Sequence, residues 1–152
     1  MAHFLELGAT VSSAHLRQLA NLSRLENEPA WTVKQLSSAC QGTETVMAII
    51  SGDSLVGYMV AAHVLDQADI HTVVVDVAVR GRGYAKQLLQ TMLARLAGKG
   101  VEQVFLEVRK SNQAAQRLYL GAGFSFTGKR RHYYTNADGV REDALLMMMS
   151  IN

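Results

Sequence analysis

A glycine-rich, basic turn between an apolar strand pattern and an amphipathic helix pattern constrains the fold of this chain more than any other feature. The turn lies within VVVDVAVRGRGYAK, residues 73–86, and a second strand pattern follows the helix. A strand, a helix and a second strand in this order form a βαβ unit, whose strands are parallel and joined by a right-handed crossover. The sequence therefore predicts parallel strands at 70–79 and 101–109, with a ligand site at their carboxyl ends.

The turn itself has the composition of an anion-binding site. Gly81 and Gly83 allow several backbone N–H groups to point at one spot, next to the positive end of the helix dipole. Arg80, Arg82 and Lys86 add positive charge around that spot. A phosphate or pyrophosphate is therefore the expected ligand. The turn lacks the Gly-Lys-Ser/Thr ending of a nucleoside-triphosphate loop and the third glycine of a dinucleotide fingerprint.

Hydrophobic periodicity and turn residues predict the other elements. The expected strands form two hairpins, 46–50 with 55–65 and 124–133 with 143–151, the second bracketing the loop YYTNADGV. Helices are expected at 12–26, from about Thr32 after a break at Pro29, directly after the glycine-rich turn, and from Ser111 or Asn112. The helix after the turn has the clearest helical period, carried by Ala85, Leu88, Leu89, Met92, Leu93 and Leu96.

The composition favours a single domain, 1–152, with a buried core. A formal net charge of +2 gives no argument for nucleic acid or membrane as a partner, and no apolar run reaches the ~18 residues of a membrane span. A single cysteine, Cys40, and the absence of a signal-peptide pattern lead us to expect a cytoplasmic protein. The five histidines show no metal-ligand spacing, so no metal is expected.

Glu107 is the first candidate for acid–base chemistry. Alternation along the strand places Val104, Leu106 and Val108 on one face, with Phe105, Glu107 and Arg109 on the other. A carboxylate near the carboxyl end of a parallel strand is partly withdrawn from water, which suits a general base. The alternative is a strand-end glutamate that forms an ion pair with Arg109 or Lys110.

Asn112 and Tyr119 are the next candidates. They are seven residues apart, so they lie on one face of the expected helix, and that face begins where the 101–109 strand ends. Tyr119 is placed to present its phenol to the cleft as a proton donor, and Asn112 to hydrogen-bond a ligand amide. The alternatives are core packing for the tyrosine and helix capping for the asparagine.

These motifs together resemble those of the GNAT superfamily of N-acetyltransferases. The superfamily's acetyl-CoA motif, Arg/Gln-x-x-Gly-x-Gly/Ala between a strand and a helix, is matched by RGRGYA, with Arg80, Gly83 and Ala85 at the defining positions. Within the superfamily, FLEVRKSNQAAQRLYLGAGF (105–124) and GKRRHYYTNADGVREDALLMMM (128–149) resemble the ribosomal-protein-alanine N-acetyltransferase (RimI-like) branch. Three departures lie on the acceptor side: Thr135 stands where a proline is usual, DGVREDA is one residue longer, and EPAW (28–31) replaces EPW.

The resemblance implies a fold and a set of site residues. The implied fold is α/β (α+β): a mixed, mostly antiparallel sheet of about seven strands, with a central parallel βαβ unit and about four helices. By similarity, Glu107 matches the family's proton acceptor, Tyr119 its proton donor, and Asn112 an asparagine that contacts CoA. The backbone of Val73, Val74 and Val75 would hold the acetyl and pantetheine end of acetyl-CoA. The pyrophosphate would lie on Gly81, Arg82, Gly83, Tyr84, Ala85 and Lys86.

The expected function is acetyl transfer from acetyl-CoA to the α-amine of a protein N-terminus with a first residue like Ala or Ser, such as that of a ribosomal protein. Tyr133 and Tyr134 are expected to wall a narrow slot for the extended acceptor, and three acids, Asp138, Glu142 and Asp143, to favour an amine or basic residues. The alternatives are packing within the hairpin for the tyrosines and a solvated turn for the acids.

Two other functions stay open at this point. A GNAT enzyme of the same fold would act on a small amine or an aminoglycoside. An acyl-CoA-binding module would have no turnover, although the presence of both Glu107 and Tyr119 argues against it.

Overall fold

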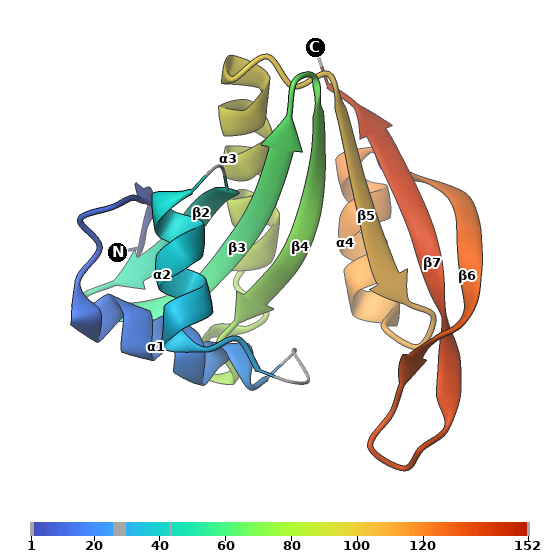
Figure 1. The fold of residues 1–152 in the computed structure, drawn as a ribbon, viewed down its shortest axis with the longest axis horizontal. Helices are drawn as coiled ribbons and strands as arrows, with labels where there is room; N and C mark the ends of the chain where they lie inside the picture. Colours follow the sequence, from blue (N-terminus) through green and yellow to red (C-terminus); the bar gives the residue numbers. More distant parts are fainter. Residues whose placement is uncertain (1, 26–29, 43, 152) are drawn as a thin grey trace.

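The computed structural model describes residues 2–25, 30–42 and 44–151. Within these ranges seven strands form one sheet in the order β1-β2-β3-β4-β5-β7-β6, and four α-helices pack on it (Figure 1). The strands are β1 (Ala2–Leu7), β2 (Glu44–Ser51), β3 (Ser54–Val64), β4 (Gln67–Val75), β5 (Gln103–Arg109), β6 (Ser125–Thr135) and β7 (Arg141–Ser150). The helices are α1 (Ser13–Ser23), α2 (Val33–Gln41), α3 (Tyr84–Gly98) and α4 (Gln113–Ala122). β4 and β5 are parallel and the other neighbours antiparallel, which confirms the expected mixed sheet.

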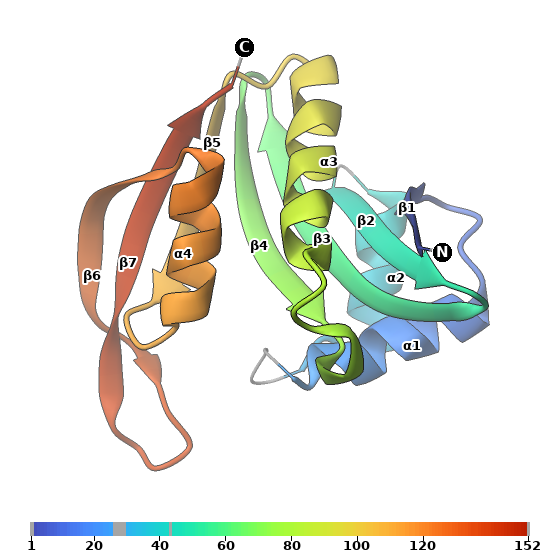
Figure 2. The same ribbon diagram turned by 180° about the vertical axis from the view of Figure 1, so that it is seen from behind.

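The helices cover the two faces of the sheet separately. α1 and α2 lie on one face, and α3 and α4 lie on the other, as the front and back views show (Figures 1 and 2). Each face has its own core: Leu19 and Leu36 pack with Tyr58 on the α1/α2 face, whereas Leu88 and Met92 belong to the core of the α3/α4 face. α1 and α2 cover the N-terminal strands only, so the α1/α2 face of β5, β7 and β6 carries no helix in the described part of the chain (Figure 1).

The side chains of β5 alternate as expected. Val104, Leu106 and Val108 are buried in the core of the α3/α4 face, whereas Phe105, Glu107 and Arg109 are only half-buried. Since successive side chains of a strand point to opposite faces, the second set lies on the α1/α2 face, at the part of the sheet that no described helix covers.

β4 and β5 separate at a bulge in β4. Their parallel pairing runs from Gln67 with Gln103 to Ile70 with Leu106 and goes no further. On the other side of β4, Val60 pairs with Thr72 and Ala61 with Ile70, so His71 is an extra residue in β4. A β-bulge bends its strand and interrupts pairing. The carboxyl ends of the two strands therefore diverge beyond this point (Figure 2).

The strand expected at 70–79 is shorter at its end than the sequence indicated. β4 stops at Val75, and residues Val77–Val79 form a single 3₁₀ turn. Asp76 ends the strand, because its side chain accepts a hydrogen bond from the Ala78 N–H at 3.0 Å. This bond stabilises a turn in place of continued pairing between strands.

The last hairpin and the first strand also differ from expectation. β6 continues to Thr135, so Tyr133 and Tyr134 belong to a strand and not to the loop. β1 was not expected from the residue pattern; it pairs with β2 over its whole length. The helix expected at 12–26 ends at Ser23, and the predicted break at Pro29, with Glu28 of EPAW, lies outside the described residues.

Candidate active site

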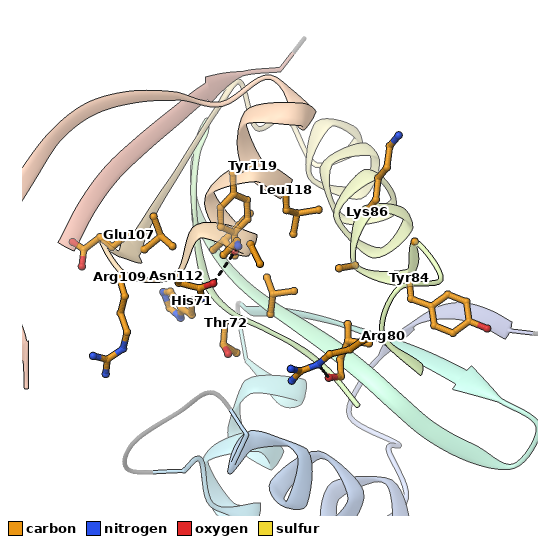
Figure 3. Close-up of a pocket in the computed structure, with 18 of the residues that line it drawn as sticks. His71, Thr72, Arg80, Tyr84, Lys86, Glu107, Arg109, Asn112, Leu118 and Tyr119 are labelled. Carbon is orange, nitrogen blue, oxygen red and sulfur yellow. Dashed lines mark hydrogen bonds between the residues drawn. The ribbon is translucent and has the colours of Figure 1, made fainter. Parts of the chain in front are cut away.

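A pocket of about 700 Å³ occupies the place where β4 and β5 separate. Its volume is typical of a small-molecule site. β4, β5, α4 and the turn before α3 form most of its wall (Figure 3). The loop before α2 and strand β6 each contribute one aromatic residue, Trp31 and Tyr134. The predicted site residues in the wall are Val73, Val75, Arg80, Gly81, Gly83, Tyr84, Ala85, Lys86, Glu107, Asn112, Tyr119 and Tyr134.

The glycine-rich turn has the geometry that its sequence predicts. Gly81 and Gly83 have φ of +81° and +77°, in the left-handed region that suits glycine, and nothing lies within 4 Å of a Cβ built at either position. Gly83 caps α3 without a side-chain hydrogen bond. The first four N–H groups of a helix have no intrahelical partner, so the start of α3 offers open donors and a positive dipole end. These features fit the pyrophosphate of acetyl-CoA.

The basic residues of the turn are placed differently from one another. The Arg80 side chain lines the pocket, where its Nε donates to the Val75 carbonyl at 3.0 Å. Lys86 and Tyr84 line the pocket too, but their side-chain ends point away from Asn112 and Tyr119 (Figure 3). The ring of Tyr84 packs edge-on against Phe4 at 6.3 Å between centroids. Arg82 is not part of the pocket wall.

The three valines of β4 alternate across the sheet. Val73 and Val75 line the pocket and pack against the core of the α3/α4 face, whereas Val74 is buried in the core of the α1/α2 face. The bulge at His71 determines which residues of β4 face each side of the sheet. Because of it, Ile70 and Val73 face the same side although they are three residues apart. The backbone of Val73–Val75 thus lies along one wall of the pocket.

Glu107 is bound by a residue that the sequence did not indicate. Its Oε1 lies 3.2 Å from Nε of Arg130, on β6. The sequence alternative named Arg109 or Lys110 as the partner. Arg109 instead lies 3.8 Å from Glu142, and it donates to the Asn136 Oδ1 at 2.8 Å. The Glu107 side chain is 28% exposed and lines the pocket, so a substrate amine can reach it.

Tyr119 and Asn112 combine a structural role with a place in the pocket wall. Tyr119 is 7% exposed, and its ring packs edge-on against Phe124 at 5.6 Å between centroids. Asn112 is the N-cap of α4, where its Oδ1 accepts the Ala115 N–H at 3.1 Å (Figure 3). Helix capping, the alternative proposed for Asn112, is therefore present alongside its position in the pocket.

The two tyrosines of β6 have different surroundings. Tyr134 lines the pocket, and the guanidinium of Arg109 lies 4.3 Å from the centre of its ring. Burial raises the pKa of the Tyr134 phenol, and the nearby carboxylate of Glu107 raises it further. Tyr133 packs edge-on against Tyr134 at 5.1 Å but is 48% exposed and is not part of the pocket wall.

Each of the three acids of the last hairpin accepts a hydrogen bond, and Glu142 accepts one from outside the hairpin. Asp138 accepts the Val140 N–H at 2.9 Å, inside the β6–β7 turn. Asp143 accepts the His132 N–H at 3.0 Å, which lowers the pKa of the Asp143 carboxyl. Glu142 accepts from Ser111 at 2.9 Å and lies beside Arg109. The contacts of Asp138 and Asp143 support the hairpin conformation, whereas Glu142 connects β7 to Ser111 and to Arg109 of β5.

Sequence reasoning did not assign several residues of the pocket wall to the site, among them Trp31, His71 and Thr72. The Trp31 backbone N–H donates to Oγ of the buried Ser23 at 2.7 Å, which ties the loop before α2 to the end of α1. The only sequence signal for Trp31 was its place in EPAW, and His71 and Thr72 depend on a bulge that no local pattern indicates.

The arrangement suits a transfer between two substrates that enter from opposite faces. Glu107, on the α1/α2 face, can take a proton from one of them, and Tyr119, on α4, can donate a hydrogen bond or a proton to the other.

No cluster of three or more His, Cys, Asp or Glu with metal-binding spacing occurs among the residues described. No helix in the described ranges is long and apolar enough to cross a membrane.

Comparison with known proteins identifies the family. The sequence matches the acetyltransferase (GNAT) family over residues 14–124. It is 30% identical to the ribosomal protein bS18-alanine N-acetyltransferase of Salmonella typhimurium over 148 residues, which cover 90% of this chain and 99% of that protein. It is 37% identical to the Haemophilus ducreyi enzyme of the same name over 97 residues, 64% of this chain and 67% of that protein.

The fold agrees with this result. The crystal structure of the Escherichia coli ribosomal-protein-S18-alanine N-acetyltransferase matches with a TM-score of 0.88 and 27% identity, over 100% of this chain and 95% of that one. The Arabidopsis thaliana NAA60 complex with acetyl-CoA matches in fold with a TM-score of 0.86 at 21% identity, over 100% and 99% of the two chains. The chain therefore belongs to the acetyltransferase (GNAT) family and is an N-acetyltransferase that uses acetyl-CoA.

Proposed function

We propose that this enzyme acetylates the α-amine of a protein N-terminus that begins with Ala or a similar small residue such as Ser, with a ribosomal protein as the first candidate acceptor. The relatives named ribosomal protein bS18-alanine N-acetyltransferases support the acceptor class. The observation that carries the proposal is the placement of Glu107 and Tyr119, which line one pocket from opposite faces of the sheet.

Acetyl-CoA supplies an acetyl group as a reactive thioester. The turn before α3 and the first residues of the helix, Gly81 to Lys86, would bind the pyrophosphate through open backbone N–H groups and the helix dipole. The backbone of Val73–Val75 would hold the pantetheine and acetyl end along β4. Asn112 stands at the other side of the same pocket, at the start of α4.

The acceptor must lose a proton before it can react. A protein α-amine has an unperturbed pKa of about 7.7–8.0, so it arrives largely as an ammonium group at neutral pH. Glu107 takes that proton, directly or through one water. The neutral nitrogen then forms a bond to the thioester carbonyl carbon, the carbon–sulfur bond breaks, and the nitrogen loses its remaining excess proton to solvent, which leaves a neutral amide and the CoA thiolate. A backbone N–H of β4 would stabilise negative charge on the carbonyl oxygen.

Tyr119 acts on the leaving group. Its phenol donates a hydrogen bond or a proton to the departing CoA thiolate from the α3/α4 side of the pocket. A thiol has a lower unperturbed pKa than a phenol, about 8.5 against 10, so orientation of the sulfur contributes alongside proton transfer.

The acceptor enters from the α1/α2 face. Trp31 and Tyr134 supply aromatic walls there from two different segments, and Glu107 lies in the same pocket wall. A slot of this kind accepts an extended N-terminus more readily than a lysine side chain within a chain. In this proposal residues 1–152 act as one catalytic domain, because the seven strands described form one sheet. A ribosomal protein as acceptor fits a cytoplasmic location.

The test is an acetyl-transfer assay that measures CoA release. The acceptors are a short peptide beginning Ala-Arg, the same peptide with a blocked N-terminus, a blocked peptide with an internal lysine, and a panel of small amines that includes an aminoglycoside. We expect turnover with the free N-terminus alone. Turnover restricted to small amines would leave the acetyl-CoA site in place and overturn the proposed acceptor, and efficient lysine acetylation would overturn the slot.

A further inference from the structure

The ion pair between Glu107 and Arg130 crosses an intervening strand. Glu107 on β5 lies opposite Leu146 on β7, and Leu146 lies opposite Gly128 on β6. Arg109 lies opposite Ala144, and Ala144 lies opposite Arg130. Gly128 has no side chain, so Arg130 can extend diagonally over β7 and place its Nε 3.2 Å from the Glu107 carboxylate.

The other contacts of the two nearby arginines decide which of them pairs with Glu107. Arg109 is closer to Glu107 in sequence and on the same face, but its guanidinium is held by Asn136 at 2.8 Å and by Glu142 at 3.8 Å. It also lies over the ring of Tyr134. Glu107 therefore pairs with Arg130. The charged side chains form two distinct pairs, Glu107 with Arg130 and Glu142 with Arg109, rather than one shared cluster.

The position of the Arg130 side chain depends on an irregular part of strand β6 and not on packing in the core. β6 loses its regular pairing with β7 between Arg130 and Tyr134, and His132 there adopts a φ of +52°. The N–H of His132 donates to Asp143, and the guanidinium of Arg130 lies 5.0 Å from the ring centre of Tyr133. The Arg130 side chain is 55% exposed, so the pair is screened by water and adds little to stability.

We propose that Arg130 is a positioning residue for Glu107, and this inference rests on the proposed role of Glu107 as the general base. Arg130 holds Glu107 through Oε1, which fixes the carboxylate at the pocket wall while the acceptor site is empty. Oε2 then takes the proton of the arriving ammonium group. A weak, exposed ion pair suits this role, because it orients the base without competing strongly with the substrate for it.

The role predicts a specific pattern of kinetic defects. Arg130→Gln should lower kcat with the acceptor peptide about tenfold, because a misplaced base reacts slowly even when the substrate is bound. The KM for acetyl-CoA should stay within about twofold of the wild-type value, since Arg130 is not part of the wall that faces the cofactor. Arg130→Lys keeps the charge and should restore most of kcat. Arg131→Gln, at the adjacent exposed position, is the matched control and should match the wild type.

A double-mutant cycle tests whether Arg130 acts through Glu107. In a Glu107→Gln background, Arg130→Gln should lower kcat by less than twofold, since the carboxylate that Arg130 positions is already absent. An equal loss in both backgrounds, or no loss in the wild-type background while Glu107→Gln is impaired, would overturn this inference and leave the proposed function standing. Unchanged turnover of Glu107→Gln, or no acetylation of any acceptor in the panel, would overturn both. Thermal melting of each variant excludes loss of fold as the cause.

Discussion

Glu107 and Tyr119 line one pocket from opposite faces of the sheet. Tyr119 belongs to the core of the α3/α4 face together with Leu106 and Val108, and Glu107 lies between these two residues on the strand and so points to the other face. The opening between β4 and β5, which starts after Ile70 and Leu106, lets both side chains line the same pocket. The proposed base on one face and the proposed acid on the other would match a transfer between two substrates that approach from opposite sides.

Glu107→Gln should lower kcat at least about 100-fold, because the amide cannot take a proton from the acceptor ammonium group. The KM for acetyl-CoA should change little. Steady-state kinetics with a peptide that has a free N-terminus measures both. Glu102→Gln, an exposed glutamate just before β5, is the matched control and should behave like the wild type. Equal turnover of the two variants would remove Glu107 from the mechanism.

Tyr119→Phe should lower kcat about 10- to 100-fold and leave the fold intact. The phenylalanine keeps the ring that packs edge-on against Phe124, so the loss reports on the hydroxyl group rather than on packing. The measurement is kcat together with the melting temperature. Normal turnover of the variant, whatever its melting temperature, would remove the Tyr119 hydroxyl group from the mechanism.

Gly83→Ala should destabilise the protein by about 1–2 kcal/mol and weaken acetyl-CoA binding, because the residue has a φ of +77°. No atom lies within 4 Å of the added methyl group, so the strain is in the backbone and not a clash. Gly98→Ala, at the other end of α3 with the same open space and no positive φ, is the control. It should be neutral or stabilise by up to about 0.5 kcal/mol. Urea unfolding and calorimetric binding measure the two effects.

Ser23→Ala should cost about 1–2 kcal/mol, because it leaves the Trp31 backbone N–H without its buried acceptor. The wall that Trp31 forms should then loosen, so the acceptor KM should rise while the acetyl-CoA KM stays near its original value. Trp31 is the only tryptophan of the chain, and its fluorescence reports on the change directly. Ser38→Ala, exposed on α2, is the control. A normal acceptor KM in a destabilised Ser23→Ala variant would show that the loop before α2, which carries Trp31, takes no part in acceptor binding.

Asp143→Ala should make the stability of the last hairpin less dependent on pH. The His132 N–H holds the pKa of the Asp143 carboxyl below its ordinary value of 3.8, so the folded state binds the proton less readily than the unfolded state. The stabilisation is therefore complete above pH 3.8 and is lost as the pH falls through the lower, folded-state pKa. Urea unfolding at a series of pH values should show the wild type and the variant converging at the acidic end. A constant difference between them at all pH values would contradict this origin.

Several features could be predicted because they depend on neighbours in the chain. The crossover between β4 and β5 follows from the order strand, helix, strand, and the positive φ values follow from the glycines at 81 and 83. The two faces of β5 follow from alternation, which placed Glu107 correctly. The family motif RGRGYA predicts the side of the pocket that is proposed to bind acetyl-CoA, and the turn that carries it lines that pocket.

Other features depend on residues that the fold brings together from distant positions. The choice of Arg130 rather than Arg109 as the partner of Glu107 results from pairing across β7 and from the contacts that hold Arg109 elsewhere. The opening of the pocket depends on an extra residue, His71, whose presence in β4 is defined only by the register with β3. Trp31 reaches the pocket because Ser23 holds its backbone. Local residue patterns set the direction of side chains and the conformation of turns, whereas partners and pocket walls are set by strand register and packing between segments far apart in the chain.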